Sequence, residues 1–296
     1  MEFTNLEGKK EKVKGGGVCI YCGRDGKAAK LTNEHTVPYS LGGNTELLEA
    51  SCDQCSGITS YLDGYLANSV FNHFRVHLGL QSRSGHPEVL PATIGLPEGQ
   101  KIVDLRPEDH PYFLNMPIWN PPGLMRDDAK ITDDFSGYRT DVYWYVPQNI
   151  RQTLGLSEDS QAEIVNNVKP HNLNTFARGI AKIAYCTAVI NYGLDGFIPL
   201  IIPQLILGEY PHVPYLVGPM PSPHPPANPR GQQHMVQFGH ITYRNLKLLH
   251  ARVRLFADSS SPDGGMPIYI VILGVERKRK IIPRRALPNP RDPILL

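Results

Sequence analysis

The sequence predicts an α+β protein, with a small N-terminal module closed by a metal ion and a larger C-terminal α+β domain that carries an antiparallel sheet. Three observations predict this fold class. Two Cys-x-x-C pairs, at 19–22 and 52–55, bracket two short strand patterns. An amphipathic helix pattern follows the second pair directly. Towards the other end, three strand-like segments follow one another at 233–239, 246–256 and 266–274.

The 296 residues suffice for more than one core, and the composition suggests four segments along the chain. Residues 1–17 are polar and lysine-rich and end in three glycines, which predicts a flexible basic arm. The module then spans 18–79. Residues 80–100 are rich in Ser, Gly and Pro and are expected to form a linker. Residues 101–296 would form the C-terminal α+β domain, and the sequence does not disclose its role.

Within the module, the pattern predicts strand, strand and helix in that order. Residues 31–39 are expected to be extended, because Pro38 disfavours helix for the residue before it. Leu-Gly-Gly-Asn at 41–44 has the composition of a turn, and 46–51 returns as a second strand. From residue 56 onward, apolar side chains recur at three- and four-residue steps, which indicates an amphipathic helix.

The C-terminal segment is expected to combine short strands with one long helix. Alternations such as K-I-V-D-L and Y-R-T-D-V-Y-W-Y-V predict strands between 101 and 146. Residues 174–192 predict a helix with an apolar stripe. The three later strand patterns are separated by a polar turn and a loop, so an antiparallel meander carrying a helix is the expected arrangement.

Composition and charge fit a globular protein with a polyanionic partner. Apolar residues make up 41% and charged residues 20%, and the net charge is +2. Lys and Arg concentrate at 9–30 and 277–291, which suits contact with phosphates, although either end can equally be a solvated tail. The most apolar region, 183–207, is interrupted by Asn, Gly, Asp and Pro, so we expect no membrane span. The N-terminus lacks the apolar core of a signal peptide, so a cytoplasmic, reducing location is expected.

The four paired cysteines predict a zinc site. In a reducing compartment, paired thiols indicate metal more often than disulfide. Tetrahedral Zn²⁺ accepts four thiolates at about 2.3 Å per bond, which leaves no position for water and makes the site structural. A module of roughly 45 residues can hardly fold on its own core, so zinc should supply much of its folding free energy. The fifth cysteine, Cys186, lies in an apolar helical pattern and is expected to be buried.

Between the two pairs lies the dipeptide Glu34-His35. Hydrolysis of a phosphodiester needs a base that takes a proton near neutral pH and a cation that offsets developing charge. An imidazole titrates in that range, and a carboxylate is a suitable ligand for Mg²⁺. Neighbours in a strand point to opposite faces, so the two act at one centre only if the backbone turns there. In isolation, a histidine in such a loop is more often a surface or capping residue.

The segment E-H-T-V-P-Y-S-L-G-G-N, enclosed by C-I-Y-C and C-D-Q-C, resembles the zinc-containing branch of the HNH endonucleases, whose ββα-metal fold has the same element order. The resemblance covers 18–63. The rest of the chain is similar to the long C-terminal part of uncharacterised bacterial HNH proteins through A-R-G-I-A-K-I-A-Y, Y-G-L-D-G-F and V-R-L-F-A, which implies no activity. The family implies a metal-dependent endonuclease acting on DNA, with RNA as the alternative substrate.

Residue by residue, the resemblance implies that His35 is the general base and that Glu34 is a ligand of the catalytic Mg²⁺ or Mn²⁺ ion. Asn44 falls near the family's middle asparagine, which braces the loop. The implied structural zinc ligands are Cys19, Cys22, Cys52 and Cys55.

The sequence departs from the family directly after the last cysteine, where Ser56 stands in place of Asn or His. A serine hydroxyl is a poor Mg²⁺ ligand, so the ion would be held through water or by Asp63, two turns along the same helical face. Two outcomes follow. The site either binds metal weakly and keeps its activity, or it is degenerate and binds nucleic acid without cutting it.

Three arginines are candidates for binding the scissile phosphate: Arg24, Arg75 and Arg83. His73 and His77 are four residues apart on the helix, a spacing that can hold a metal, although an ordinary polar helix face is the favoured explanation. The alternative to an enzyme is a zinc-ribbon nucleic-acid-binding or adaptor protein with no chemistry. Ser56 is the best support for that alternative. The sequence does not indicate an oligomeric state.

Overall fold

The structure is a computed structural model. It describes residues 3–5, 11–80, 85–126, 130–157, 159–165, 170–221, 234–257 and 266–277. Within these ranges, no helix combines the length and the apolar character needed to cross a membrane.

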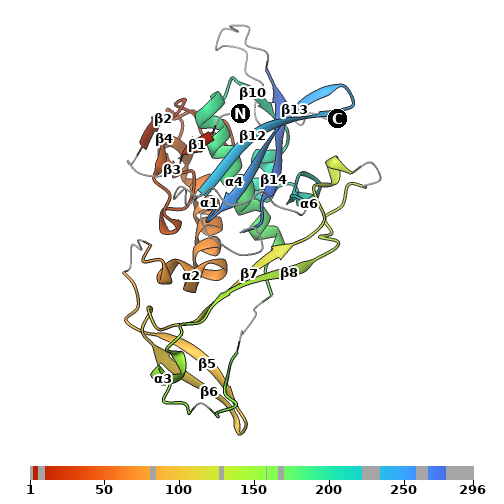
Figure 1. Cartoon of the computed structure of the whole chain (residues 1–296). Helices are drawn as coiled ribbons and strands as arrows, with labels where there is room; N and C mark the ends of the chain where they lie inside the picture. Colours follow the sequence, from red (N-terminus) through yellow and green to blue (C-terminus); the bar gives the residue numbers. More distant parts are fainter. Residues whose placement is uncertain are drawn as a thin grey trace.

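The predicted fold class, α+β with a small cysteine-bearing module ahead of a larger part with antiparallel strands, is confirmed (Figure 1). In the module, β3 (Leu31–His35) and β4 (Thr45–Cys52) pair antiparallel, and α1 (Asp53–Tyr65) follows at once. A single 3-10 turn, η1 (Tyr39–Leu41), lies between the two strands. The predicted order of strand, strand and helix is therefore the observed one.

Part of the predicted flexible arm is a strand. β2 (Glu11–Lys14) runs parallel to β4, so the module sheet has the order β2-β4-β3. The backbone continues to Gly15, whose N–H donates to Leu48 O at 2.9 Å. A Cβ at Gly15 would lie 2.4 Å from that oxygen, so glycine is what permits this close approach. Before it, β1 (Phe3–Asn5) pairs with β12 of the main sheet.

The helix that leaves the module is interrupted once. α1 passes into a π-helical turn, η2 (Leu66–Val70), and continues as α2 (Asn72–His77). The N–H of Phe71 donates to Leu66 O at 2.9 Å, which is the i to i−5 bond of a π-turn. The extra residue lets both Leu66 and Phe71 face the core, where both are fully buried.

The main sheet is built on the predicted meander. β12 (His234–Tyr243), β13 (Leu246–Leu255) and β14 (Tyr269–Glu276) are consecutive and antiparallel. Arg244 and Asn245, both with positive φ, form the two-residue turn between the first two strands. Two short strands complete this edge by pairing with β14: β10 (Phe197–Pro199) and β11 (Val217–Pro219). The short helices α5 (Ile202–Leu207) and α6 (Val213–Leu216) connect them.

A separate set of strands extends from the body at the lower end of Figure 1. The hairpin β7 (Tyr112–Ile118) and β8 (Arg139–Tyr145) leads towards it, with η3 (Gly123–Met125) between the two strands. The remaining elements are β5 (Leu90–Leu96), β6 (Gly99–Leu105), α3 (Ile150–Thr153) and β9 (Glu163–Ile164). The three strands among them form a sheet of order β6-β5-β9.

β5, with 7 residues, occupies a third of the segment 80–100 that composition suggested as a linker. Leu90, Ala92 and Ile94 are buried, whereas the residues between them are not, which is the alternation of a half-buried strand. Pro91 and Gly95 gave this stretch the composition of a linker. Proline is tolerated here because it lies at the start of the strand.

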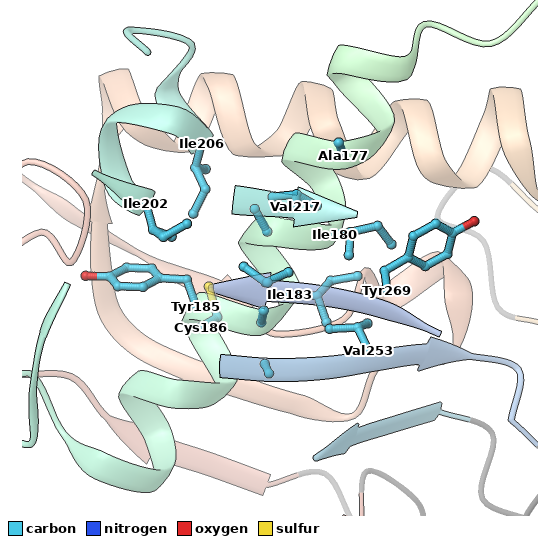
Figure 2. Close-up of a cluster of buried hydrophobic side chains, with 14 of the residues drawn as sticks. Ala177, Ile180, Ile183, Tyr185, Cys186, Ile202, Ile206, Val217, Val253 and Tyr269 are labelled. Atoms are coloured by element: carbon cyan, nitrogen blue, oxygen red, sulfur yellow. The ribbon is translucent and has the colours of Figure 1, made fainter. Parts of the chain in front are cut away.

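The long helix α4 (Leu173–Tyr192) packs on the main sheet and on the module at the same time. Its first turn is capped by the side chain of Asn172, which accepts from the Thr175 N–H at 3.0 Å. Figure 2 shows Ile180 and Ile183 of this helix beside Val217 and Val253 of the sheet. The buried apolar side chains of the module and of α4 belong to one hydrophobic cluster, so the module shares its core with the body.

Polar contacts also join the module to the body. The Tyr185 hydroxyl donates to Ile20 O at 2.7 Å, and the Tyr21 hydroxyl lies 3.1 Å from the Cys186 sulfur. The ring of His234 connects β12 to the turn at Leu41, because its Nε2 donates to Leu41 O at 2.6 Å. The burial predicted for Cys186 is confirmed.

The turn at 41–44 requires both of its glycines. Gly42 ends η1 in the left-handed region with φ 89°. At Gly43, an added Cβ would lie 2.0 Å from Val37 O, which is backbone and cannot move aside. We expect Gly43→Ala to lower the free energy of unfolding by about 3 kcal/mol or more, as measured by urea denaturation.

The matched control is Gly57→Ala. Gly57 is exposed within α1, and a Cβ there meets nothing within 4 Å. This variant should keep or gain stability, by up to about 1 kcal/mol, because alanine is the better helix former. Equal stability of the two variants would contradict the close approach at Gly43.

The contact through His234 predicts acid sensitivity. Burial lowers the pKa of His234 to about 4, and its Nδ1 accepts from the Phe256 N–H at 3.2 Å. An unfolded histidine takes a proton near pH 6.5, whereas the folded one stays neutral down to about 4. Stability is therefore lost as the pH falls between these values, by about 1.4 kcal/mol per pH unit.

Urea denaturation at a series of pH values measures this slope. His234→Gln should have a shallower slope of unfolding free energy against pH than the wild type between pH 6.5 and 4. Burial also lowers the pKa of His250 to about 4, so part of the slope should remain in the variant. Identical slopes would show that His234 is not the group responsible.

Candidate functional site

The four paired cysteines converge at one point of the module. Cys19 and Cys22 lie in the turn before β3, where the Cys19 N–H donates to Arg24 O at 2.8 Å. Cys52 ends β4, and Cys55 lies in the first turn of α1. All four sulfur atoms lie within 4.8 Å of one another.

The spacing of these sulfurs matches a tetrahedral metal site. The sulfurs of Cys22 and Cys52 are 3.7 Å apart. Four Zn–S bonds of about 2.3 Å in a tetrahedron would separate neighbouring sulfurs by about 3.8 Å. The donor set and its geometry therefore fit a structural zinc ion, as the sequence predicts.

The charges of the cluster also favour a cation. The hydrogen bond from the Cys55 thiol lowers the pKa of Cys19 to about 4. That same contact, followed by burial, raises the pKa of Cys55, and burial raises the pKa of Cys22. One thiolate therefore opposes the ionisation of the next. A bound zinc ion would stabilise all four thiolates together.

Glu34 is buried, with 5% of its surface exposed, and both of its carboxylate oxygens have partners. Oε1 lies 3.0 Å from the Nζ of Lys182 on α4. Oε2 accepts a hydrogen bond of 3.0 Å from the hydroxyl of Thr59 on α1. The side chain expected to hold a catalytic ion is thus held between two helices.

Lys182 is fully buried and has three sets of partners. Besides Glu34, its Nζ lies 3.0 Å from both carboxylate oxygens of Asp63, and it donates to the backbone carbonyl of His35. Burial by itself would lower the pKa of Lys182, but the carboxylates of Asp63 and Glu34 outweigh burial and raise it. The ammonium group is therefore charged at neutral pH.

This arrangement corrects the expected metal ligands. A divalent ion bridging Glu34 and Asp63 would need the position that the Lys182 ammonium takes. The two acidic residues proposed as ligands are indeed close together, but an ammonium group from α4 lies between them. They do not fit a bound Mg²⁺ or Mn²⁺ in this arrangement. The third proposed ligand, Ser56, is half-buried on α1, and its backbone carbonyl accepts from the Thr59 hydroxyl at 3.3 Å.

His35 lies on the other face of β3. Successive side chains of a strand point to opposite faces, and His35 is half-buried whereas Glu34 is buried. Its ring meets that of Tyr39 edge-on, with centroids 5.8 Å apart. The irregularity of β3 falls between Thr32 and Glu34, before the pair, so Glu34 and His35 do not share one centre.

The remaining candidates lie apart from this network. Asn44 is half-buried just before β4, and its carbonyl accepts from the Glu11 N–H at 3.1 Å. Arg24 is exposed beside the thiol cluster. Arg75 is a correction, because it is buried and donates to Ala67 O and to the Asn68 side chain, both at 3.0 Å, and so is not available to a phosphate. Arg83 lies outside the described residues.

His73 and His77 have different partners. The ring of His73 contacts that of His110, with centroids 4.9 Å apart. The ring of His77 contacts those of Tyr112 and Tyr145, with centroids 4.9 Å apart in both cases. Across the described ranges, the cysteine cluster is the one group of three or more His, Cys, Asp or Glu side chains with the spacing for a metal ion. The simpler interpretation of the two histidines, an ordinary helix face, is consistent with these contacts.

Two residues of the network were not foreseen: Lys182 and Thr59. Lys182 carried a usable signal, because it stands in A-R-G-I-A-K-I-A-Y, where the helix is apolar on nearly every side. A charged side chain in such a helix needs a buried partner of opposite charge. Thr59 carried no signal, because a threonine on the polar face of a helix pattern is ordinarily exposed.

Metal analysis tests the thiol cluster. We expect one zinc per chain in the purified protein and a loss of that zinc in Cys52→Ser, because a hydroxyl is a poor zinc ligand beside three thiolates. Cys186→Ser is the matched control. It removes a buried thiol outside the cluster and should keep the zinc. Unchanged zinc content in Cys52→Ser would contradict the assignment.

The geometry of this site agrees with a comparison to known protein families. Residues 19–70 match the family model described as HNH endonuclease. No curated protein and no solved structure matches the chain. The matched segment begins at the first cysteine, contains all four cysteines and the Glu34-His35 pair, and ends within η2. The chain therefore carries, at residues 19–70, an HNH endonuclease domain whose four-cysteine cluster is of the zinc-binding kind.

Proposed function

We propose that the chain is a nuclease that hydrolyses phosphodiester bonds in DNA, with RNA as the alternative substrate. The match of residues 19–70 to the HNH endonucleases carries this proposal. The placement of His35 and the charges on the module support it.

His35 is the group that takes a proton from the attacking water. A neutral imidazole is a base in the pH range where such a reaction runs. The side chain is half-buried, so solvent reaches it, and Tyr39 packs edge-on against its ring. Its backbone carbonyl accepts from Lys182, so the residue is held from behind by the body of the protein.

Exposed cations on the module supply contacts to the nucleic-acid backbone. They lie on β2 and in the loop after the first cysteine pair: Lys12, Lys14, Arg24, Lys27 and Lys30. Within residues 11–30 the acidic residues are Glu11 and Asp25, and across the sheet Lys12 lies 3.9 Å from Glu46. Contacts of this kind bind phosphates independently of base sequence and weaken as salt is added.

A divalent ion supplies charge stabilisation at the leaving oxygen in metal-dependent phosphodiester hydrolysis. Glu34 and Asp63 do not fit such an ion while Lys182 lies between them. We therefore assign no step to an ion held by these two residues. The roles given to this chain's own residues are proton transfer at the His35 imidazole and phosphate binding by the surface cations.

Two observations favour a second candidate function. Glu34 is held by Lys182 and Thr59, and Ser56 stands where the family has a metal ligand. Both suit a domain that has kept the fold and the nucleic-acid contacts without the chemistry. The alternative is a non-catalytic nucleic-acid-binding protein.

Nicking of supercoiled plasmid tests the two functions. In buffer with Mg²⁺ or Mn²⁺, the wild type should convert the plasmid to open circles, and His35→Ala should be slower by about 100-fold or more, because it lacks the base. Rates come from the conversion of supercoiled to open-circular DNA on gels.

His240→Ala is the matched control for the loss of an imidazole. His240 lies on β12, is partly exposed, and pairs with Glu276 at 2.8 Å. It should cut like the wild type. Equal nicking by His35→Ala and wild type would indicate contamination. No nicking by either, together with salt-dependent DNA binding, would establish the non-catalytic alternative.

A further inference from the structure

The contacts of Lys182 saturate its ammonium group. An ammonium has three N–H donors and no acceptor. The three partners here are the Glu34 carboxylate, the Asp63 carboxylate and the backbone carbonyl of His35. Each partner belongs to the HNH domain, whereas Lys182 lies on α4, more than 100 residues beyond the matched segment.

The position of this ammonium is that of a bridging cation. Divalent ions bind carboxylate oxygens at about 2.0–2.6 Å. The Nζ of Lys182 lies 3.0 Å from Glu34 Oε1 and 3.0 Å from each oxygen of Asp63. A divalent ion between the same two carboxylates would occupy the space of the ammonium or lie against it. Two cations at that separation, one of them the fully buried Lys182 ammonium, repel each other strongly.

Lys182 is also anchored by its surroundings. None of its surface is exposed, and the helix on either side of it is buried in the shared core. The neighbouring Ala181 and Ile183 are fully buried as well. Withdrawal of the ammonium would leave two carboxylates without a counter-charge, one of them with only 5% of its surface exposed.

We propose that Lys182 is a built-in cation of the HNH domain. Its ammonium replaces a divalent ion between Glu34 and Asp63, and this carboxylate pair binds no divalent ion in the native protein. Lys182 is a positioning residue, because it fixes β3 at Glu34 and at the backbone of His35 without reaching the solvent that His35 meets. The proposal concerns the carboxylate pair and holds whether or not the domain cuts nucleic acid.

Counting bound Mn²⁺ tests the native protein directly. Mn²⁺ titration followed by electron paramagnetic resonance, on protein that retains its zinc, should give the same number of bound ions for wild type and Glu34→Gln. In the wild type, Glu34 is paired with the Lys182 ammonium, so removal of the Glu34 carboxylate should not remove a divalent-ion site. A wild type that binds one more Mn²⁺ than Glu34→Gln would overturn the proposal.

Removal of the built-in cation should create a divalent site. Lys182→Met keeps an unbranched side chain, shorter by the terminal nitrogen, and deletes its charge. We expect this variant to bind one Mn²⁺ more than the wild type, and its melting temperature to rise with added Mn²⁺ or Mg²⁺, because the ion restores the missing counter-charge. The double variant Lys182→Met with Glu34→Gln should lose the gained ion.

Arg178→Met is the matched control. Arg178 precedes Lys182 by one turn of α4 and donates to Ile206 O at 3.1 and 2.9 Å, away from the carboxylate pair. It should gain no Mn²⁺ and show no ion-dependent rise in melting temperature. Identical behaviour of a folded Lys182→Met and Arg178→Met would contradict the proposal. If Lys182→Met does not fold, the comparison of wild type with Glu34→Gln decides alone.

These outcomes are distinct from those of the nicking assay. Absence of cutting removes the proposed nuclease activity and leaves the Mn²⁺ counts unchanged. If the wild type binds a divalent ion that Glu34→Gln does not bind, the proposed role of Lys182 is refuted and the proposed nuclease activity is unaffected. The two proposals can therefore fail separately.

Discussion

The ion network around Lys182 is the interaction on which the arrangement of the site depends. A buried ammonium and two carboxylates are costly to bring together, because each loses its hydration. Once they are together, the loss of one member leaves the others without a counter-charge, at about 3–5 kcal/mol for a buried pair. The network therefore ties β3, α1 and α4 to one geometry. Lys182 contacts both residues of the Glu34-His35 dipeptide: the side-chain carboxylate of Glu34 and the backbone carbonyl oxygen of His35.

The HNH domain depends on the rest of the chain in a second way. Its buried residues and those of α4 form one cluster, and a buried tyrosine hydroxyl and a buried histidine ring join the two parts. The cluster of four thiols lies at one end of the domain, and α4 packs against the apolar side chains of the remainder of the domain. A segment this small seldom buries enough apolar surface by itself. The C-terminal region thus has a structural role in the domain, in addition to any partner that it binds.

Sequence reasoning found the parts of the fold that local patterns encode. The cysteine spacing predicted the cluster, and the three strand patterns near the C-terminus predicted the meander, because each Cys-x-x-C pair and each strand pattern is a signal contained within a few neighbouring residues. It failed where distant residues decide the outcome. Pro91 and Gly95 gave β5 the composition of a linker. Its strand conformation depends on pairing with β6 and β9, which lie elsewhere in the sequence. Arginine is a residue type that commonly binds phosphate, but Arg75 is buried against η2. Its burial follows from the π-turn, which no local sequence pattern predicts.

The same limit applies to the site. Glu34 and Asp63 were recognised as a pair of acids near one another, and the structure brings them together. What the sequence did not reveal is the cation between them, because a lysine 119 residues beyond Asp63 comes close only through the fold of the whole chain. The two-residue period of a strand puts Glu34 and His35 on opposite faces, and their expected action at one metal ion required a turn of the backbone at the pair, whereas the irregularity of β3 lies before it. The role of His35 as a base remains a proposal, because the position of a substrate decides it.

The long separation between Asp63 and Lys182 has a consequence for synthesis on the ribosome. Translation of the intervening 119 residues takes roughly 6 to 24 s at about 5–20 residues per second. For that interval the nascent domain has its thiols and its acids but not its lysine. The two acids can therefore reach the geometry of the finished structure only after α4 has been made. Completion of this site therefore follows the synthesis of α4 rather than the last peptide bond of residues 19–70.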